Sequence, residues 1–510
     1  MIHPIKRFHK TYRLKTWLLL ALLSAVSCSK LIEIDPPINS ISTEQVFQND
    51  AKANAALAAL YGEMINTTTE NTFVFGGLTL IGGLMADECF PSAGTVDLVN
   101  GPFYLNKVLP RNDRLSAIWN EGYRYIYIAN SLIEGVEGSA SPHLSDTTRR
   151  QVVGEAKFVR AWTHFNLANL FGPVPLVLTT DVTKTRYLSR AGMPEVYAQL
   201  EADLKDAWDL LQPDYHFGGG ARIRPNRFAA AALLARVYLY QGRWAEAEAE
   251  AAKVIGNAAY VLEPLAKTFR ETSRETIWSL KRNAAGQNID YLMDAFNFSP
   301  KYRFSVMPPD AHMLWYDKDM FEMISVDLGM IIPIFQMSPE LTGAFEPNDR
   351  RKTVWMDSIP WPEAAPYNGK TTYFSAKYNS SLTLVEPADL GQCMVRLAEV
   401  YLIRAEARAQ QGTNLAGAAA DLDAIRERAG LERTTASTKP ALLDAILRER
   451  RVELFAEWGH RWFDLKRAGK AAEMAALYPD KQPWSDSKLL LPIPAAELEI
   501  APSLYQNPGY

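Results

Sequence analysis

The sequence predicts a mainly α protein of tetratricopeptide-like helical hairpins, with a large irregular, loop-rich region that carries short strands. Helical periodicity recurs in paired segments, mainly within residues 118–257 and 393–467. The stretches 66–116 and 258–390 lack this period and are rich in loop-forming and aromatic residues. The composition, with 48% hydrophobic and 22% charged residues among 510, is that of a globular protein with ample core.

The segment 1–27 has the pattern of a lipoprotein signal peptide. Residues 1–15 hold basic residues and no acid, and roughly ten apolar residues follow, about half of what a bilayer span needs. Small residues then precede Cys28, the candidate lipidation site; the alternative is a plain secretory signal with an incidental cysteine. Residues 28–41, which include Pro36-Pro37, are expected to form the lipidated N-terminus and a semi-extended tether.

A single domain is expected over residues 42–510. Its first helix begins at a capping-box pattern, Ser42 to Gln45, and Gly172-Pro173 ends a later one. The periodicity predicts helices over residues 50–64, 118–136, 147–171, 194–211, 226–241, 243–255, 395–411, 415–429, 439–458 and 462–467. A short strand is expected over Thr276–Lys281, and the C-terminal segment 471–510 is expected to be extended.

The helical pairs carry a repeat signal. Small alanines and larger apolar residues alternate on both sides of Gly242, and residues 398–429 repeat the arrangement more loosely around Gly412. Small side chains let two helices approach closely, and a stack of at least three such hairpins is stable. A repeat scaffold of this kind normally binds other molecules rather than transforming them.

Composition excludes several classes of function. The chain has 54 basic and 58 acidic residues, and loss of the leader would remove only basic ones, so a nucleic-acid binder is not expected. Besides Cys28 only Cys89 and Cys393 remain, which leaves one Cys89–Cys393 bridge open but no disulfide framework. The seven histidines show no metal-binding spacing, so neither a metal nor another cofactor is expected.

Six blocks of sequence, in order, are similar to one known family. The blocks are Ile34 to Pro37, Val46 to Tyr61, Glu155 to Leu176, Arg396 to Ala407, Glu449 to Arg467, and Leu491 to Pro494 with Gln506 to Tyr510. On these blocks the chain resembles the SusD/RagB family along essentially its whole mature length. The expected domain over residues 42–510 is therefore SusD-like.

The resemblance implies a lipoprotein of the outer membrane that faces the cell exterior and is not an enzyme. It implies a partner, a SusC-type TonB-dependent barrel, over which the protein acts as a lid and to which it delivers a nutrient oligomer. The ligand implied is an oligosaccharide or polysaccharide, with a peptide as the alternative. Two further interpretations stay open: an exported glycoside hydrolase that uses Asp87, Glu88 or Asp290, and a lid without ligand selectivity.

Glycan binding needs aromatic plates for the C–H faces of sugars and polar groups for their hydroxyls, both displayed on loops. The sequence offers these in two regions, and the alternative for each aromatic residue is burial within the loops. The candidates are Asp87, Asn100, Phe103 and Tyr104 in the first region, and Tyr291, Tyr302, Arg303, Trp315 and Tyr316 in the second. Trp315 and Tyr316 lead, and Trp355, Trp361 and Tyr367 are weaker candidates.

Other conspicuous residues have a structural interpretation. The cluster around His460-Arg461, with Arg450, Glu453 and Asp464, is expected to form ion pairs rather than a catalytic site. Asp349-Arg350-Arg351 is expected to be a turn with structural charge pairs. The tryptophans within predicted helices, which are Trp119, Trp162, Trp208, Trp244 and Trp458, are expected in the core.

Overall fold

The computed structural model describes residues 43–65, 72–282, 292–300, 332–363, 368–378 and 391–510. The chain divides into two compact units, residues 1–46 and 47–510. In the first unit the described element is the short helix α2 (Thr43–Val46). The expected signal peptide, Cys28 and most of the tether lie outside the described residues. No helix in the described ranges is long and apolar enough to span a bilayer.

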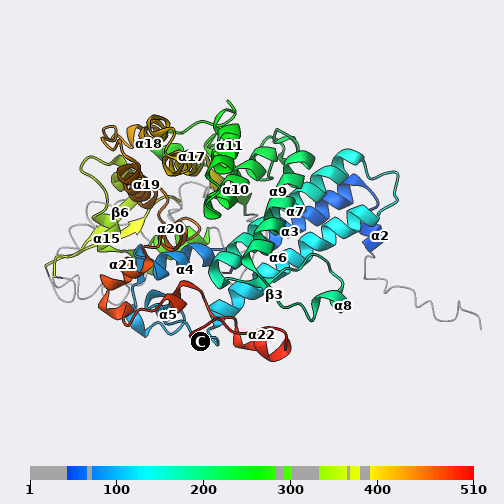
Figure 1. Ribbon diagram of the computed structural model, residues 1–510, viewed down its shortest axis with the longest axis horizontal. Helices are drawn as coiled ribbons and strands as arrows, with labels where there is room; N and C mark the ends of the chain where they lie inside the picture. The colour runs from blue at the N-terminus through cyan, green and yellow to red at the C-terminus, as the bar shows by residue number, and fades with distance from the viewer. Residues whose placement is uncertain (1–42, 66–71, 283–291, 301–331, 364–367, 379–390) are drawn as a thin grey trace, which may run out of the picture. The chain divides into compact units, whose positions relative to one another are not determined.

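Helices dominate the second unit, and neighbours in the chain pack on one another (Figure 1). The main helices are α3 (Asp50–Ile65), α6 (Asp113–Gly138), α7 (Asp146–Phe171), α9 (Met193–Leu210), α10 (Arg227–Tyr240), α11 (Trp244–Ile255), α17 (Leu397–Gln411), α18 (Leu415–Arg428) and α19 (Lys439–Glu453). Helix α11 packs against α17, so the two helical halves join although the whole loop-rich stretch separates them in the chain. The predicted helical hairpins are confirmed.

The hairpin of α10 and α11 shows why this sequence folds in this way. Gly242 has a φ of +71°, a backbone conformation that suits glycine, so the chain can reverse between the two helices. Ala235, Ala247 and Ala251 have no exposed surface, which lets the helix axes come close together. The later repeat has the same construction: Gly412 ends α17 at a φ of +75°, and a core of alanines and leucines joins α17, α18 and α19.

Polar caps fix the helix ends near the positions that the sequence predicts. The Ser145 hydroxyl accepts a hydrogen bond from Thr148 N at the start of α7, and Gly172 ends that helix at a φ of +76°. The Asn226 side chain accepts from two backbone N–H groups of α10. These capped boundaries lie within a turn of the predicted ones.

Three predicted segments differ from the structure. The stretch 66–116, predicted as loops, contains the fully buried helix α4 (Gly77–Met85). Helix α19 ends at Glu453 instead of residue 458, because Ala456 and Trp458 have φ values of +52° and +49° that no α-helix contains. The C-terminal segment 471–510 is not simply extended, because α21 (Ala471–Ala476) and α22 (Ala495–Ile500) interrupt it.

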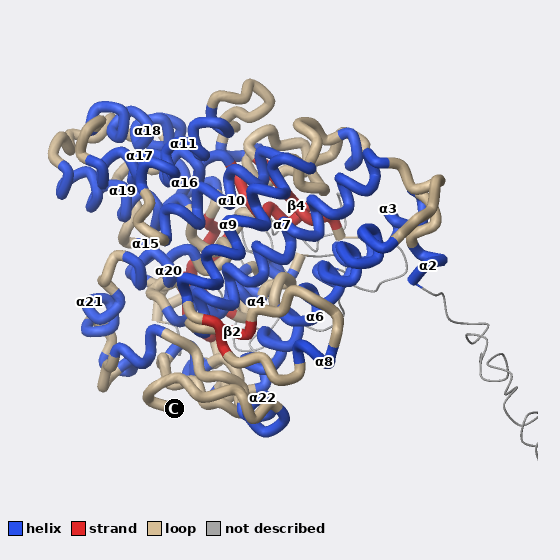
Figure 2. The backbone as a smooth tube through the Cα atoms, turned by 45° about the vertical axis from the view of Figure 1, so that its right-hand side comes forward, coloured by secondary structure: helices blue, strands red, loops and turns tan. Residues whose placement is uncertain are grey.

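The strands form short antiparallel pairs, visible as isolated red segments in Figure 2. The pairs are β1 (Cys89–Pro91) with β5 (Phe335–Met337), β2 (Val174–Pro175) with β3 (Arg190–Ala191), β4 (Thr276–Lys281) with β8 (Gly391–Arg396), and β6 (Met356–Pro360) with β7 (Thr371–Ser375). The predicted strand over Thr276–Lys281 is confirmed. Its partner β8 runs directly into α17, so this pair connects the loop-rich region to the second helical half.

Short helical turns complete the described chain. They are α5 (Gly101–Tyr104), α8 (Val182–Thr185), α12 (Met293–Phe298), α15 (Pro339–Thr342), α16 (Arg350–Val354), α20 (His460–Arg467) and the 3-10 turns Gly94–Val96, His216–Gly218, Leu265–Lys267, Pro479–Lys481 and Asp486–Leu489. Of the tryptophans expected in the core, Trp119, Trp162 and Trp458 are buried, whereas Trp208 and Trp244 are partly exposed.

The two cysteines in the described part of the chain do not pair. Cys89 and Cys393 are both buried free thiols, so the Cys89–Cys393 bridge that the sequence left open is excluded. Burial raises the pKa of both thiols, which keeps them protonated and inert. Apolar packing and ion pairs, not a disulfide, hold the described fold together.

Candidate functional site

Asp87, a predicted ligand-binding residue, forms ion pairs with two arginines of the protein. Its carboxylate accepts hydrogen bonds from Arg461 Nε at 2.7 Å and Nη2 at 3.0 Å, and Arg451 Nη2 lies 2.8 Å away. Burial alone would raise the pKa of Asp87, but these arginines hold it below its ordinary value. The residue therefore joins the segment after α4 to α19 and α20.

Asn100 and Phe103 stabilise the loop in which they lie. The Asn100 side chain donates to Asp97 Oδ2 at 2.8 Å and accepts from Arg114 Nε at 2.7 Å, so its polar atoms are engaged within the protein. Phe103 has no exposed surface, because the one-turn helix α5 packs against α4. The expectation that Phe103 offers a plate to a ligand is therefore corrected: the ring belongs to the core.

Tyr104 is the member of this first group that stays partly exposed. Its ring lies 5.1 Å from the ammonium group of Lys481, which also donates to the carbonyls of Leu84 and Tyr104 and to Asn106 Oδ1. One buried lysine thus ties the end of α4, α5 and the C-terminal segment together. The contact between this lysine and the Tyr104 ring is a cation–π interaction.

The second group of predicted residues lies outside the described residues. This group consists of Tyr291, Tyr302, Arg303, Trp315 and Tyr316. Their roles stay predictions, as does that of the weaker candidate Tyr367. The described flank of this region is α12, after which the Ser299 hydroxyl donates to the Ser375 carbonyl at 2.8 Å.

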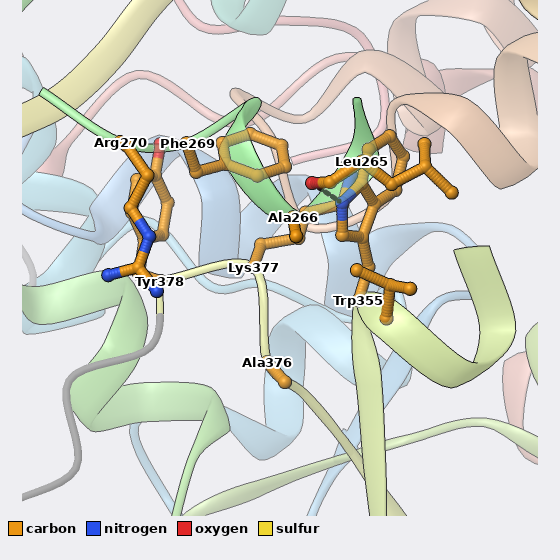
Figure 3. Close-up of a pocket in the computed structure, with 9 residues that line it drawn as sticks. Leu265, Ala266, Phe269, Arg270, Trp355, Ala376, Lys377 and Tyr378 are labelled. Carbon is orange, nitrogen blue, oxygen red and sulfur yellow. Dashed lines mark hydrogen bonds between the residues drawn. The ribbon is translucent and has the colours of Figure 1, made fainter. Parts of the chain in front are cut away.

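A cavity of about 230 Å³ lies in the loop-rich region (Figure 3). The side chains around it come from three stretches: Leu265, Ala266, Phe269 and Arg270; Val354 and Trp355; Ala376, Lys377 and Tyr378. Trp355 Nε1 donates to the Leu265 carbonyl at 2.9 Å, the bond drawn in Figure 3. Trp355 is one of the weaker candidates from the sequence. Phe269 and Lys377 could not be predicted as lining residues, because neither lies in a recognisable motif.

The aromatic faces at this cavity already bind cations of the protein. Lys377 Nζ lies 4.9 Å from the Trp355 ring, 5.3 Å from Phe269 and 3.9 Å from Phe455. Trp355 is 1% exposed and Trp361 3%, so neither offers the open ring face that stacking on a sugar requires. The cavity is therefore lined by the exposed side chain of Arg270 and by buried aromatic rings that serve the fold. We call the rings of Phe269, Trp355 and Phe455 around Lys377 the aromatic box.

Lys377 of the aromatic box also belongs to a network of buried ion pairs. Arg396 binds Glu275 at 2.9 Å and Glu453 and Glu457 at 2.5 and 2.8 Å, and Lys377 binds Glu457 at 2.6 Å. Burial lowers the pKa of Lys377 to about 8, an effect that Glu457 opposes. The charged clusters that the sequence assigned to structure are confirmed as ion pairs, including Arg450 with Asp464 and Arg351 with Asp349.

The acidic pair Asp87-Glu88 superficially suggests acid–base chemistry. Burial raises the pKa of Glu88 to about 8, with a contribution from Asp87, while the pKa of Asp87 is lowered. However, Glu88 is 2% exposed and Asp87 is held by two guanidinium groups, so the two carboxyls cannot flank a sugar linkage. Opposite shifts in this pair reflect packing, not a catalytic site.

Blocks of the sequence that lie far apart in the chain meet in space. Asn507 Nδ2 donates to the carbonyls of Phe171 and Leu491, and Arg190 Nη2 donates to Asn507 Oδ1 at 2.5 Å. The C-terminal tail is thereby docked on the end of α7, just where Gly172 and Pro173 stop that helix. The fold and these contacts define a helical-repeat binding scaffold with a loop-rich face.

Comparisons with known proteins identify this scaffold. One family model, described as "Starch-binding associating with outer membrane", matches residues 92–239, and the SusD family model matches residues 368–510. Together they span more than half of the chain. The chain belongs to the SusD/RagB family, whose members are non-catalytic, glycan-binding proteins associated with the outer membrane.

Relatives match over nearly the whole length. SusD-like protein P2 of Formosa agariphila is 26% identical over 532 residues, which cover 97% of this chain and 99% of that protein. A SusD-like protein of Bacteroides ovatus is 23% identical over 475 residues and covers 87% and 80%.

Solved structures share the fold. A SusD superfamily protein from Bacteroides vulgatus has a TM-score of 0.73 at 21% identity, and the match covers 91% of this chain and 100% of that one. A laminarin-binding SusD-like protein has a TM-score of 0.72 at 27% identity with the same coverage.

Proposed function

We propose that this protein is a surface lipoprotein of the outer membrane that captures a glycan and delivers it to a SusC-type TonB-dependent transporter. The observation that carries the proposal is the nearly full-length similarity to a laminarin-binding SusD-like protein, at 27% identity. The lipoprotein pattern ending at Cys28 and the outer-membrane association of the family support the location. The peptide alternative rests on the same loop aromatics, which would also take apolar side chains.

Ligand capture is expected to use the loop-rich face. Trp315 and Tyr316 lead among the proposed contacts, with Tyr104 as the described aromatic that stays partly exposed. Sugar rings stack on such plates while amides, carboxylates and arginines bind their hydroxyls. Affinity is expected to be modest, because a captured ligand must also be released into the barrel.

A binding screen tests this function. The chain from residue 31 onward would be titrated with laminarin, other neutral and acidic polysaccharides and peptide mixtures, and the same tubes analysed for products. We expect binding to a glycan without products, weakened about 5- to 150-fold by Trp315→Ala, which corresponds to about 1–3 kcal/mol for a binding hot spot. Tyr127→Ala, at a 56% exposed position on α6, is the matched control.

Three outcomes would contradict parts of the proposal. Binding of peptides alone would replace the glycan by a peptide ligand. Silence across the panel, together with co-purification of a barrel, would favour the lid without ligand selectivity. Released sugars that depend on Asp87, Glu88 or Asp290 would restore the hydrolase interpretation.

A further inference from the structure

We propose that a cavity formed by α19, α20 and α21 is an anion-selective subsite that binds the carboxylate or sulfate group of an acidic sugar. The inference rests on the proposed glycan capture and adds a class of ligand to it. The cavity holds about 250 Å³. Helix α20 packs against both α19 and α21, which Figures 1 and 2 place in the same part of the molecule, and the segment after α4 contributes Asp87.

Cations exceed anions around this cavity. Its lining includes Arg448, Arg451, Arg461 and Lys470 against Asp87, Asp444 and Glu473. Lys470 and Asp444 neutralise each other at 3.0 Å. Arg451 and Arg461 share the single carboxylate of Asp87, so one positive charge of that trio is not balanced.

Because Arg451 and Arg461 share one carboxylate, their two positive charges repel each other. The Arg451 side chain is 17% exposed, and its Nε is buried without a hydrogen-bond acceptor. Burial lowers the pKa of Arg451, and the charge of Arg461 lowers it further. A second anion in the cavity would relieve this repulsion, because opposite charges a few ångströms apart attract strongly near a protein surface.

Arg448 supplies the open guanidinium group. It is exposed on α19, three residues before Arg451 and therefore on the same helix face, and the described part of the chain offers it no salt bridge within 4 Å. Arg448 also lines a neighbouring cavity of about 430 Å³. The acids of that second cavity are already engaged: Glu346 with Arg426 at 2.6 Å, and Glu449 and Asp349 with Arg351 at 2.6 and 2.8 Å.

Apolar walls favour a sugar over a bare inorganic anion. Leu447, Leu465, Met474 and Leu477 line the first cavity, and Leu477 is 72% exposed. A sugar acid presents C–H groups to such walls while its carboxylate or sulfate meets the planar donor fork of arginine. Arg448 lines both cavities, so a neighbouring residue of the same polysaccharide would occupy the second one.

Charge-changing variants test this subsite in the full-length protein, purified in detergent. Arg448→Gln removes the open charge, and Arg186→Gln, at an exposed position just after α8 far from this cavity, is the matched control. Glu473→Gln removes an exposed acid from the cavity lining. The probes are an oligogalacturonate for carboxylates, a sulfated polysaccharide for sulfate esters, and laminarin as a neutral glycan.

We expect Arg448→Gln to weaken binding of an acidic probe about tenfold, the usual worth of one charge-assisted hydrogen bond. Glu473→Gln should strengthen the same binding about two- to threefold, because it removes repulsion at the surface. Arg186→Gln and the affinity for laminarin should not change. Opposite effects of two substitutions in one cavity cannot come from a general loss of folding.

The subsite would be overturned if Arg448→Gln and the parent protein bound both acidic probes with equal affinity. Glycan capture would still stand in that case, provided that laminarin or either acidic probe binds. Absence of binding to every glycan would overturn both proposals. Full competition by inorganic sulfate, or by an acidic peptide, at the same concentration as the sugar would overturn the assignment to a sugar. Loss confined to one of the acidic probes would support the subsite and identify its anionic group.

Discussion

At the scale of single residues, Glu88 couples the fold to pH. It is 2% exposed, its Oε1 has no hydrogen-bond partner, and burial with the Asp87 charge raises its pKa from 4.5 to about 8. Since the folded pKa lies above the unfolded one, the stability contributed by the neutral form is complete below pH 4.5. It is lost as the pH rises through about 8.

Glu88→Gln removes this titration. We expect the free energy of unfolding of the variant, relative to the parent, to increase by roughly 2–4 kcal/mol between about pH 5 and pH 8. Urea unfolding at several pH values measures this difference, with Glu473→Gln, an exposed position, as the control. Parallel pH profiles of Glu88→Gln and the parent would contradict the assignment.

Arg396 is the cation that three buried glutamates share, and each of them also pairs with Arg428, Arg351 or Lys377. The three glutamates converge on the Arg396 guanidinium group, and all four side chains are almost fully buried. Removal of one partner leaves the others charged in a medium that solvates them poorly. We expect Arg396→Ala to lower the free energy of unfolding by about 3–5 kcal/mol.

A surface arginine provides the comparison for Arg396. Arg433 pairs with Glu427 in an exposed position, with 76% and 48% of the two side chains accessible. Fully exposed pairs are screened by solvent and contribute little, so Arg433→Ala should leave the urea midpoint nearly unchanged. Similar losses for the two variants would mean that the buried cluster is not maintained by its central cation.

At the scale of elements, the helical repeats could be predicted because half-buried helices carry a 3.6-residue period and recognisable caps. Helix α4 could not. Its sequence, GLTLIGGLM, is buried on every side, so it has no polar face to produce that period, and three of its nine residues are glycine. The end of α19 was misplaced for a related reason: Glu457 and Trp458 continue the pattern, but tertiary ion pairs and packing take them out of the helix.

The glycines of α4 permit its contact with the start of α20. A Cβ atom at Gly82 would lie 2.2 Å from the Cα of Gly459, a distance that only a backbone shift could relieve. We therefore expect Gly82→Ala to destabilise the protein by about 1–3 kcal/mol or more, as overpacking does. Thermal unfolding should show the loss as a lower Tm.

Gly138 is the matched control for Gly82. It ends α6, and a Cβ atom there would meet nothing within 4 Å. Gly138→Ala should therefore leave the Tm unchanged or raise it slightly, because alanine favours the helix by up to about 1 kcal/mol over glycine. A Gly82→Ala variant as stable as Gly138→Ala would show that α4 and α20 can separate without cost.

At the scale of the whole molecule, the fold class and the family could be predicted from the sequence, whereas the candidate site could be predicted only in part. Six dispersed blocks were recognisable, and the structure explains why: Leu491 N donates to the Leu170 carbonyl, and Asn507 bonds to Phe171, so blocks far apart depend on each other. The aromatics of the loops carried no such constraint. Whether a ring such as Phe103 or Tyr104 points outward depends on tertiary packing, which no local pattern records.

Attachment to the membrane is the property that the whole-molecule proposal needs most. Each buried CH2 of an acyl chain contributes about 0.8 kcal/mol, so a cysteine with several chains would hold the protein stably at the bilayer, whereas one chain would not. We expect cells fed a labelled fatty acid to label the parent protein and to place it in the outer-membrane fraction. Cys28→Ser should lose both the label and the fractionation.

Cys89→Ser is the control for Cys28, because Cys89 is a free, buried thiol that a lipid-transferring enzyme cannot reach. This variant should keep the label. Protease added to intact cells then tests the outward face, since Ser29-Lys30-Leu31-Ile32 places no acid directly after Cys28, unlike many lipoproteins exported to the surface. Cleavage in intact cells supports capture outside the cell. If the labelled protein is cut only after the outer membrane is opened, the protein faces the periplasm. In that position it could not collect a glycan for a barrel that transports inward.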